Sequence, residues 1–405
     1  MRVTKISLLA SLLLYTSSFA VDNIEVSGAG KFFYGTVDGS PDGTSRPNLF
    51  NKEGAFAQFG IDMGIAADLG AGFKGKIAGT GLATANMGGN IVNAPWATGM
   101  MGSQVWLSEV YLNKNVLDKT AVTLGRQSLD TPFAFTELWN IAANTFDAVL
   151  VENTDLSDTT LIGAYIDKGN GVNGFATVNP AIADSGKLKN PFKKFYEGAY
   201  VVGAKNKSFN GTELQAWFYE LKNTAKSYWI QGDTEFSGIT LGAQAAVLNL
   251  DNTLDSSDNS KAYAAKIGYT AIENLTLSAA VSQTDKDGSA NFQIANLATG
   301  GSGGAQSKLY TEAWWNFGYV GKAGTTAYNV TALYTVPEIV DLGFFYTDVD
   351  QRAANGDNDM REYTLTAAKS FGSLDTSLAY VYSKANDYND AKYYNNIQVY
   401  LTYKF

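Results

Sequence analysis

The charged side chains that could do chemistry gather in one stretch, where Arg126, Asp130 and Glu137 follow each other closely. The chain contains no histidine and no cysteine. Ser–His–Asp catalysis needs histidine as its general base, and zinc sites are built largely from histidine and cysteine. Both kinds of active site are therefore excluded. We expect no catalytic, cofactor-binding or metal-binding residue, although an enzyme that relies on carboxylates remains an open alternative.

Four more charged residues lie in segments where polar and apolar residues alternate: Asp62, Lys74, Lys76 and Glu109. If those segments are strands, these side chains share the polar face. We interpret them, with the three residues above, as candidates for lining a narrow, solvent-filled lumen. Opposed charges across such a lumen create a transverse field that orients dipolar solutes. Each of the seven could equally be a solvated charge at a rim.

Two of these candidates have a competing local explanation. Arg126 is two residues from Leu124, so strict alternation in a strand places both side chains on the apolar face. A bulge at Gly125, or an early end to the strand, would return it to the polar side. Asp130 stands just before a Thr-Pro pair and could simply start a turn.

The elements that must position these charges are short alternating segments. Ile239, Leu241, Ala243, Ala245 and Val247, for example, alternate with smaller or more polar residues. A period of two indicates strands with one solvated face. We predict eighteen strands, at about 25–36, 54–67, 72–83, 103–114, 119–127, 145–152, 158–167, 196–206, 212–222, 225–235, 239–249, 260–270, 274–284, 326–336, 339–349, 360–371, 374–383 and 393–405. Residues 310–319 also look strand-like, but an even count requires them to lie in a folded external loop.

Short and long connections alternate between these segments. Ser237-Gly238 is a short connection, whereas 38–52, 128–144 and 285–325 are long. Tight turns at one end and longer loops at the other are typical of an outer-membrane β-barrel. A β-sandwich or a soluble β-helix would also alternate, but its apolar face would point into a core.

The ends of the chain favour the barrel. Arg2 and Lys5 precede an apolar run at 6–15, and small residues lead to Ala20. This pattern predicts a signal peptide over residues 1–20, because a membrane anchor needs about 20 apolar residues. The remaining residues, 21–405, are predicted to form a single barrel domain. The final segment alternates strictly and ends on Phe405, which resembles the C-terminal signal of bacterial outer-membrane barrels.

Composition and motifs argue against nucleic acid, dinucleotide and calcium as ligands. The formal net charge is −9, which gives no electrostatic footprint for nucleic acid. Gly169 to Gly174 matches the dinucleotide pattern G-x-G-x-x-G, but no helical period follows it, so we interpret it as a loop. Aspartates at 251, 255 and 258, and at 357 and 359, lack the spacing of a calcium loop. We therefore expect no cofactor.

The run GRQSLDTPFAFTELWNIAANTFDAVLV, residues 125–151, resembles the third-loop region of OprD-type outer-membrane porins and of related major porins of campylobacter-like bacteria. The run covers about a fifteenth of the chain. The resemblance implies an 18-stranded barrel whose third external loop folds inward and narrows the lumen. Charges on that loop and on the facing wall would then set selectivity.

The sequence therefore predicts an all-β, transmembrane antiparallel β-barrel of 18 strands in the bacterial outer membrane. We expect a porin for passive diffusion of small hydrophilic solutes and ions, with weak cation preference. The expected partners are outer-membrane lipid and lipopolysaccharide, and assembly as a homotrimer is left open. The alternatives are a channel that prefers small amino acids or carboxylates, and a surface adhesin or structural barrel with a closed lumen.

Overall fold

A computed structural model of the protein describes residues 21–405 apart from 41, 45, 84–103, 172–191, 253–258, 300–304 and 353–357. The expected signal peptide lies outside the described residues, as do parts of the two aspartate clusters and of the Gly169–Gly174 segment. No helix in the described part of the chain has the length and apolar character needed to cross a membrane.

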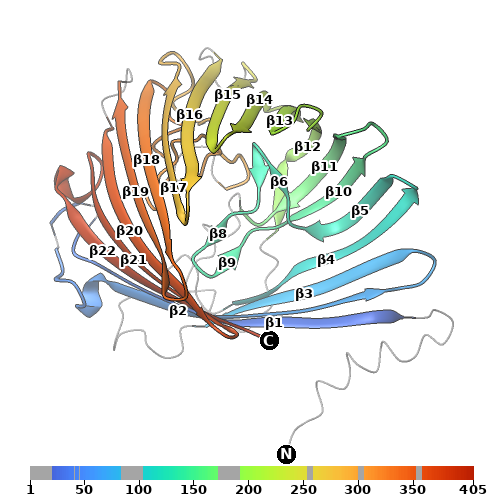
Figure 1. The fold of residues 1–405 in the computed structure, drawn as a ribbon, viewed down its shortest axis with the longest axis horizontal. Coiled ribbons are helices and arrows are strands. Elements are labelled where there is room, and N and C mark those ends of the chain that lie inside the picture. The colour runs from blue at the N-terminus through green and yellow to red at the C-terminus, as the bar shows by residue number, and fades with distance from the viewer. Residues whose placement is uncertain are drawn as a thin grey trace, which may run out of the picture.

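Eighteen strands form one antiparallel sheet that closes on itself (Figure 1). The sheet contains β1 (Asp22–Val37), β2 (Ala55–Asp68), β3 (Phe73–Ala83), β4 (Gln104–Leu117), β5 (Thr120–Gln127), β10 (Phe146–Asn153), β11 (Thr159–Gly169), β12 (Lys193–Asn206), β13 (Thr212–Leu221), β14 (Ala225–Phe236), β15 (Ile239–Leu250), β16 (Ser260–Ile272), β17 (Leu275–Thr284), β18 (Thr325–Val336), β19 (Val340–Gln351), β20 (Met360–Phe371), β21 (Leu374–Ala385) and β22 (Tyr394–Lys404). The predicted fold and strand count are confirmed. Residues 310–319 form no strand, as expected.

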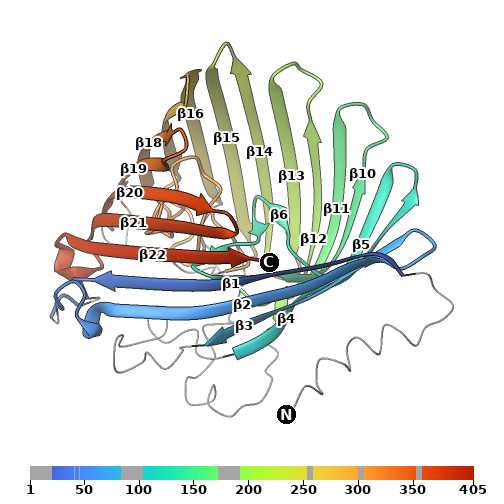
Figure 2. The same ribbon diagram turned by 60° about the horizontal axis from the view of Figure 1, so that its bottom comes forward.

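Each strand pairs with its neighbours along the chain, and β1 pairs with β22 to close the ring (Figure 2). The register runs without a shift from Ala29 opposite Lys404 to Val37 opposite Asn396. Closure matters because an unpaired backbone group in hydrocarbon costs several kcal/mol, so an open sheet edge is not tolerated in a membrane. The ring leaves no such edge.

The turns at one end are tight enough to set the register. Ser237 and Gly238 join β14 to β15 with φ angles of 51° and 77°. Positive φ at both central residues matches the twist of the flanking strands, which is why short hairpins favour residues that tolerate it. We call this the short-turn end. The opposite end carries the long connections, although residues 222–224 join β13 to β14 there by a short link, and we call it the long-loop end.

The two faces of the ring differ in polarity. Side chains pointing outward are large and apolar, and Ile61, Met63 and Leu365 are each about half exposed. Such a broad exposed apolar surface is unstable in water and suits contact with lipid. The buried clusters instead lie inside the ring, where long connections pack against its wall. Two short 3-10 helices, η1 (Lys52–Gly54) and η2 (Asn389–Ala391), lie in the outer loops.

Candidate functional site

The third long connection lies inside the ring and forms the first half of the candidate site (Figure 1). It contains two small hairpins. Strand β6 (Asp130–Thr131) pairs with β7 (Ala134–Phe135), and β8 (Leu138–Trp139) pairs with β9 (Ala142–Ala143). We call this connection, residues 128–145, the third loop. Its inward position confirms the expectation from the sequence.

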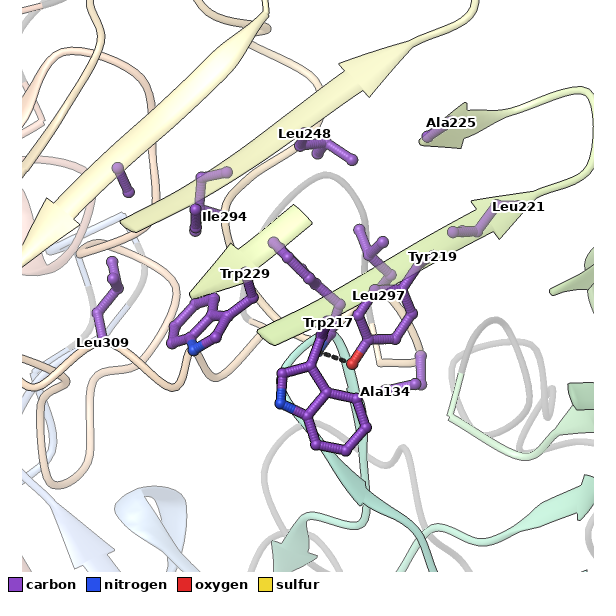
Figure 3. Packing of buried hydrophobic residues seen from close by; sticks show 14 of the residues in the cluster. Ala134, Trp217, Tyr219, Leu221, Ala225, Trp229, Leu248, Ile294, Leu297 and Leu309 are labelled. Carbon is purple, nitrogen blue, oxygen red and sulfur yellow. Dashed lines mark hydrogen bonds between the residues drawn. The ribbon is translucent and has the colours of Figure 1, made fainter. Parts of the chain in front are cut away.

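Aromatic side chains on the barrel wall hold the third loop in place. Trp217, Tyr219 and Trp229 project from the inner face of β13 and β14 beside Ala134 (Figure 3). The ring of Phe133 meets that of Tyr219 edge-on at 5.5 Å and that of Trp229 at 5.7 Å. The Tyr219 hydroxyl also accepts a hydrogen bond of 3.3 Å from the Phe133 backbone N–H. Edge-to-face contacts of this kind stabilise beyond the area they bury.

A second connection joins β17 to β18, and its described residues, 285–299 and 305–324, also pack inside the barrel; we call them the inner loop. Ile294, Leu297 and Leu309 are buried in the same cluster as Phe133. The Leu297 backbone N–H donates to the Phe133 carbonyl over 2.9 Å. The sequence predicted a folded external loop here, but the structure turns part of it into the lumen. The two loops together therefore narrow the passage.

The inner loop is attached to two separate strands of the wall. On β20, the carboxylate of Glu362 accepts hydrogen bonds from the backbone N–H groups of Trp315 and Asn316, at 2.9 and 2.8 Å. On β14, Asp233 accepts a 2.7 Å hydrogen bond from the Tyr310 hydroxyl and a 3.0 Å one from Lys266. Charged acceptors make hydrogen bonds roughly twice as strong as neutral ones. These anchors hold the loop across the lumen.

Glu137 lies in the joint between the two loops and is only 3% exposed. Its Oε1 accepts hydrogen bonds from the Asn296 amide at 2.8 Å and the Thr299 hydroxyl at 2.7 Å. Its backbone N–H donates to Asn144 over 2.6 Å. A buried carboxylate is stable only when it is paired or well hydrogen-bonded. The geometry gives Glu137 a joining position, away from the aqueous surface.

Asp130 occupies the solvated side of the same joint, with 76% of its side chain exposed. It forms an ion pair with Lys308 of the inner loop. The Lys308 ammonium also lies 4.8 Å from the centre of the Phe135 ring. This pair places one negative and one positive charge next to each other where the two loops face water.

The wall on β1 to β4 carries two further ion pairs. Asp62 meets Lys31 at 2.5 Å, and Lys76 meets Glu109 at 2.5 Å. Lys74, Lys76 and Glu109 line one cavity of about 820 Å³. The structure thus groups four of the sequence candidates on one wall, whereas Asp130 and Glu137 lie on the third loop with other partners.

Arg126 is held at the junction of β4, β5 and β10. Its Nε donates to Asp147 over 2.7 Å, and its Nη1 donates to the Leu107 carbonyl over 2.9 Å. Its guanidinium lies 3.3 Å from the centre of the Phe192 ring. Gly125 has a φ of 130°, yet the pairing with β10 continues through it without a shift. The unshifted register keeps Arg126 on the same face of the sheet as the exposed Leu124, where Asp147, Leu107 and Phe192 contact its side chain.

Sequence reasoning missed Lys31 and Lys308, which pair with the candidates Asp62 and Asp130, and it missed the separate pair of Asp233 with Lys266. Asp233 and Lys266 sit at inner-face positions of predicted strands, so their parity was a usable signal. The aromatic residues at 217, 219 and 229 were a stronger signal. They occupy the face that should be polar, which indicates that something packs against the wall there. Lys308 carried no local signal, since its place depends on how the inner loop folds.

One further carboxylate lies within the inner loop. Glu312 accepts hydrogen bonds from the backbone N–H groups of Ser307, at 2.6 Å, and Ala313, at 3.0 Å. Burial raises the pKa of Glu312 to about 7, and the nearby charge of Glu137 adds to the rise. Among the residues that the structure describes, no three acidic side chains converge as a metal site would require.

The comparisons with known proteins concern the fold. No protein-family model matches the chain, and no curated protein matches its sequence. The structure of Pseudomonas aeruginosa OccK8 (OprE) aligns with a TM-score of 0.71 over 95% of this chain and 98% of that chain, at 15% identity. Pseudomonas aeruginosa OccK9 (OpdG) gives 0.72 over 95% and 98% at 13% identity. Acinetobacter baumannii OccAB1 gives 0.72 over 96% and 98% at 12% identity. The expected OprD-type fold is confirmed.

Proposed function

We propose that this protein is a channel of the bacterial outer membrane through which small hydrophilic solutes and ions diffuse passively. The observation that carries the proposal is a closed ring of strands with an apolar outer face and two loops folded inside it. Barrels of 16–18 strands leave an aqueous channel. The loops would limit the size of solutes that pass. The fold shared with OccK8 (OprE) and the resemblance of residues 125–151 to OprD-type porins support this reading.

We further propose a weak preference for cations. The lysines of the inner wall and loops are matched by carboxylates, as in Lys31 with Asp62, Lys76 with Glu109, and Lys266 with Asp233. Paired lysines attract anions weakly, because the neighbouring carboxylate cancels most of their field. The net negative charge of the chain then favours cations near its surface, within a Debye length of about 8–10 Å.

A channel that prefers small amino acids is the second candidate function. Asp130 and Lys308 present both signs of charge on the solvated side of the loop joint. The ammonium group of an amino acid would pair with Asp130 and its carboxylate with Lys308. A simple carboxylate would pair with the lysine but be repelled by the aspartate. This arrangement favours amino acids over carboxylates among the substrates considered.

Planar-bilayer recording tests the proposed function. Purified protein refolded in detergent should give stepwise, ohmic current openings. Adding millimolar amino acid should reduce the ion current if the second candidate holds. Silence from protein shown to be folded by its heat-modifiable mobility would refute the channel and support an adhesin with a closed lumen. Native mass spectrometry of the same sample tests assembly into a homotrimer.

A further inference from the structure

The wall formed by β18, β19 and β20 carries an apolar patch that faces the lumen, on the short-turn side of the anchor of the inner loop. Glu362 points inward, because the inner loop bonds to its carboxylate inside the barrel. Side chains alternate faces along a strand, so Thr364 and Thr366 point inward as well. Thr366 is opposite Gly343, and Gly343 is opposite Leu333. Directly opposite residues share a face of the sheet, so Leu333 also points into the lumen.

Three apolar side chains make up the patch. Leu333 is 42% exposed although it points into the barrel. The ring of Phe345 covers Gly343, where an added Cβ would lie 2.8 Å from the ring Cε2. The ring of Trp314, from the inner loop, lies beside that of Phe345, with centres 6.4 Å apart and an angle of 40° between them. Both rings are partly exposed. Apolar surface left open to water is unfavourable, and patches of it commonly mark ligand-binding surfaces.

Trp314 is held in position by the residues that follow it. The side-chain amide of Asn316 donates to Glu362 over 2.7 Å and to the Ser383 hydroxyl over 2.9 Å. Its oxygen accepts a 2.8 Å hydrogen bond from the Tyr394 hydroxyl. These bonds fix the chain directly beside Trp314. A surface that is ordered before a ligand arrives loses little conformational entropy on binding.

Hydroxyl groups border the patch. A Cβ added at Gly343 would lie even closer to the Thr366 hydroxyl than to the Phe345 ring. Within the described residues this hydroxyl makes no hydrogen bond, so it is available to a ligand. Thr331 is opposite Phe345 and donates its hydroxyl to Asn329 over 2.9 Å. Its oxygen can still accept, because a hydroxyl has one donor and two lone pairs.

The same wall disfavours negatively charged solutes. The inner face of β18, β19 and β20, strands that the structure describes completely, carries no lysine or arginine. Arg361 and Lys369 have the strand parity opposite to that of Glu362, so both point outward. Asp341 lies on the inner face and accepts a 2.7 Å hydrogen bond from Thr335. A carboxylate solute therefore meets one negative charge and no positive partner on this wall.

We propose that this lumen patch binds a neutral sugar ring during its passage, an inference that rests on the proposed channel function. The patch comprises Trp314, Leu333 and Phe345, with the hydroxyls of Thr331 and Thr366 at its edge. A pyranose ring has a flat face of C–H groups, which packs against the apolar side chains through dispersion and loss of hydrated apolar area. Its hydroxyls bond to the threonines. An open-chain polyol has the hydroxyls without a fixed flat face, and an aromatic acid has the flat face with a charge that this wall disfavours.

Leu342 provides a matched control for Leu333. The two leucines are 41% and 42% exposed on neighbouring strands. Leu342 is next to Gly343 in β19, so its side chain points to the outer face. Replacing either leucine with alanine removes the same apolar group, but only Leu333→Ala removes it from the lumen. Because both side chains are well exposed, both variants should fold.

Saturation-transfer difference NMR tests the proposal with methyl β-D-glucopyranoside and the full refolded protein in an amine-oxide detergent, which contains no sugar. The ring C–H protons should receive saturation, and a titration gives the dissociation constant. Leu333→Ala should weaken binding about fourfold or more, because it removes contact equal to at least one methylene group. Trp314→Ala should weaken it at least as much, whereas Leu342→Ala should bind like the parent protein. Mannitol and benzoate should both bind more weakly than the glucoside.

Equal affinities of Leu333→Ala and the parent would overturn the proposal, as would an equal loss in Leu342→Ala. Mannitol that binds as tightly as the glucoside would show that hydroxyl groups alone are recognised, and tighter binding of benzoate would assign the patch to aromatic acids. Either result contradicts the proposal. Bilayer currents recorded on the same samples separate this inference from the channel. Protein that binds the glucoside but passes no current refutes the channel alone, and current without glucoside binding refutes the sugar site alone.

Discussion

The side-chain amide of Asn296 donates to the carboxylate of Glu137 over 2.8 Å, joining two loops whose contact residues are 159 positions apart in the chain. Asn296 also donates to the Phe135 carbonyl over 2.8 Å and accepts from the Phe135 N–H over 3.3 Å. One residue thus satisfies three buried groups of the third loop.

Replacing Asn296 with alanine should loosen this joint. Buried polar groups left without partners cost about 1–3 kcal/mol, so the docked arrangement of the loops becomes less favoured. We expect noisier single-channel currents with frequent excursions to higher conductance. Asn252→Ala, an exposed loop substitution, serves as the control and should leave the current trace unchanged. A quiet trace from Asn296→Ala would show that the joint does not hold the constriction.

Deleting Pro132 to Ala142 should widen the pore, because this segment forms most of the third loop inside the ring. The expected result is a higher single-channel conductance and a larger exclusion limit for neutral polymers. Phe133→Ala should give a smaller, fluctuating increase, since losing a buried phenylalanine costs about 3–5 kcal/mol of packing. Conductance equal to that of the parent protein after the deletion would place the constriction elsewhere.

Asp130 and Lys308 should tune ion selectivity in opposite directions. Asp130→Asn leaves the lysine unpaired and should move the reversal potential in a KCl gradient toward anions, whereas Lys308→Gln should move it toward cations. Exposed pairs contribute only about 0.2–1 kcal/mol to stability, so both variants should fold. The shifts should shrink between about 0.1 and 1 M salt as screening shortens from about 10 to 3 Å. Lys226→Gln, on the outer face, is the control; shifts of the same sign in both loop variants would contradict the assignment.

The inner loop should be held more tightly in acid than at neutral pH. The pKa of Glu312 is about 7 in the folded protein, against an ordinary value of 4.5, because burial disfavours its charged form. The folded state therefore binds more protons than the unfolded state between these two values. The free energy of unfolding therefore falls by up to roughly 3 kcal/mol as pH rises from about 4.5 to 7, and this site causes no further change above pH 7.

Single-channel recordings between pH 4 and 8 measure this effect as the frequency of loop-opening events. The frequency should rise toward pH 7 in the parent protein. Glu312→Gln is neutral at every pH. Its frequency of loop-opening events should therefore stay, at every pH, at the level that the parent protein shows in acid. A profile that keeps its slope in this variant would assign the effect to another group.

The strands were predictable because their signal is local. A period of two needs only neighbouring residues, so the alternation at 239–247 located β15 without knowledge of the rest of the fold. The inner loop was not predictable in this way. Its place depends on contacts such as that between Leu297 and Phe133, which no local pattern encodes.

The charged candidates show the same division. Parity placed Asp62, Lys76 and Glu109 on one face, and the structure brings them together with lysine or carboxylate partners on that wall. Sequence alone could not separate Asp130, which is solvated, from Glu137, which is buried in the loop joint. The difference lies in the inner-loop residues that cover one and leave the other open to water.

The seam between β1 and β22 makes assembly dependent on the whole polypeptide. Gly28 and Phe405 exchange both of their backbone hydrogen bonds, at 2.9 and 3.0 Å, so the residue that follows β22 is bonded directly to β1. A chain that lacked β22 would keep all of its remaining hairpins, but the sheet would have two unpaired edge strands. Pairing at this one seam therefore decides whether the sheet is a closed cylinder or an open one.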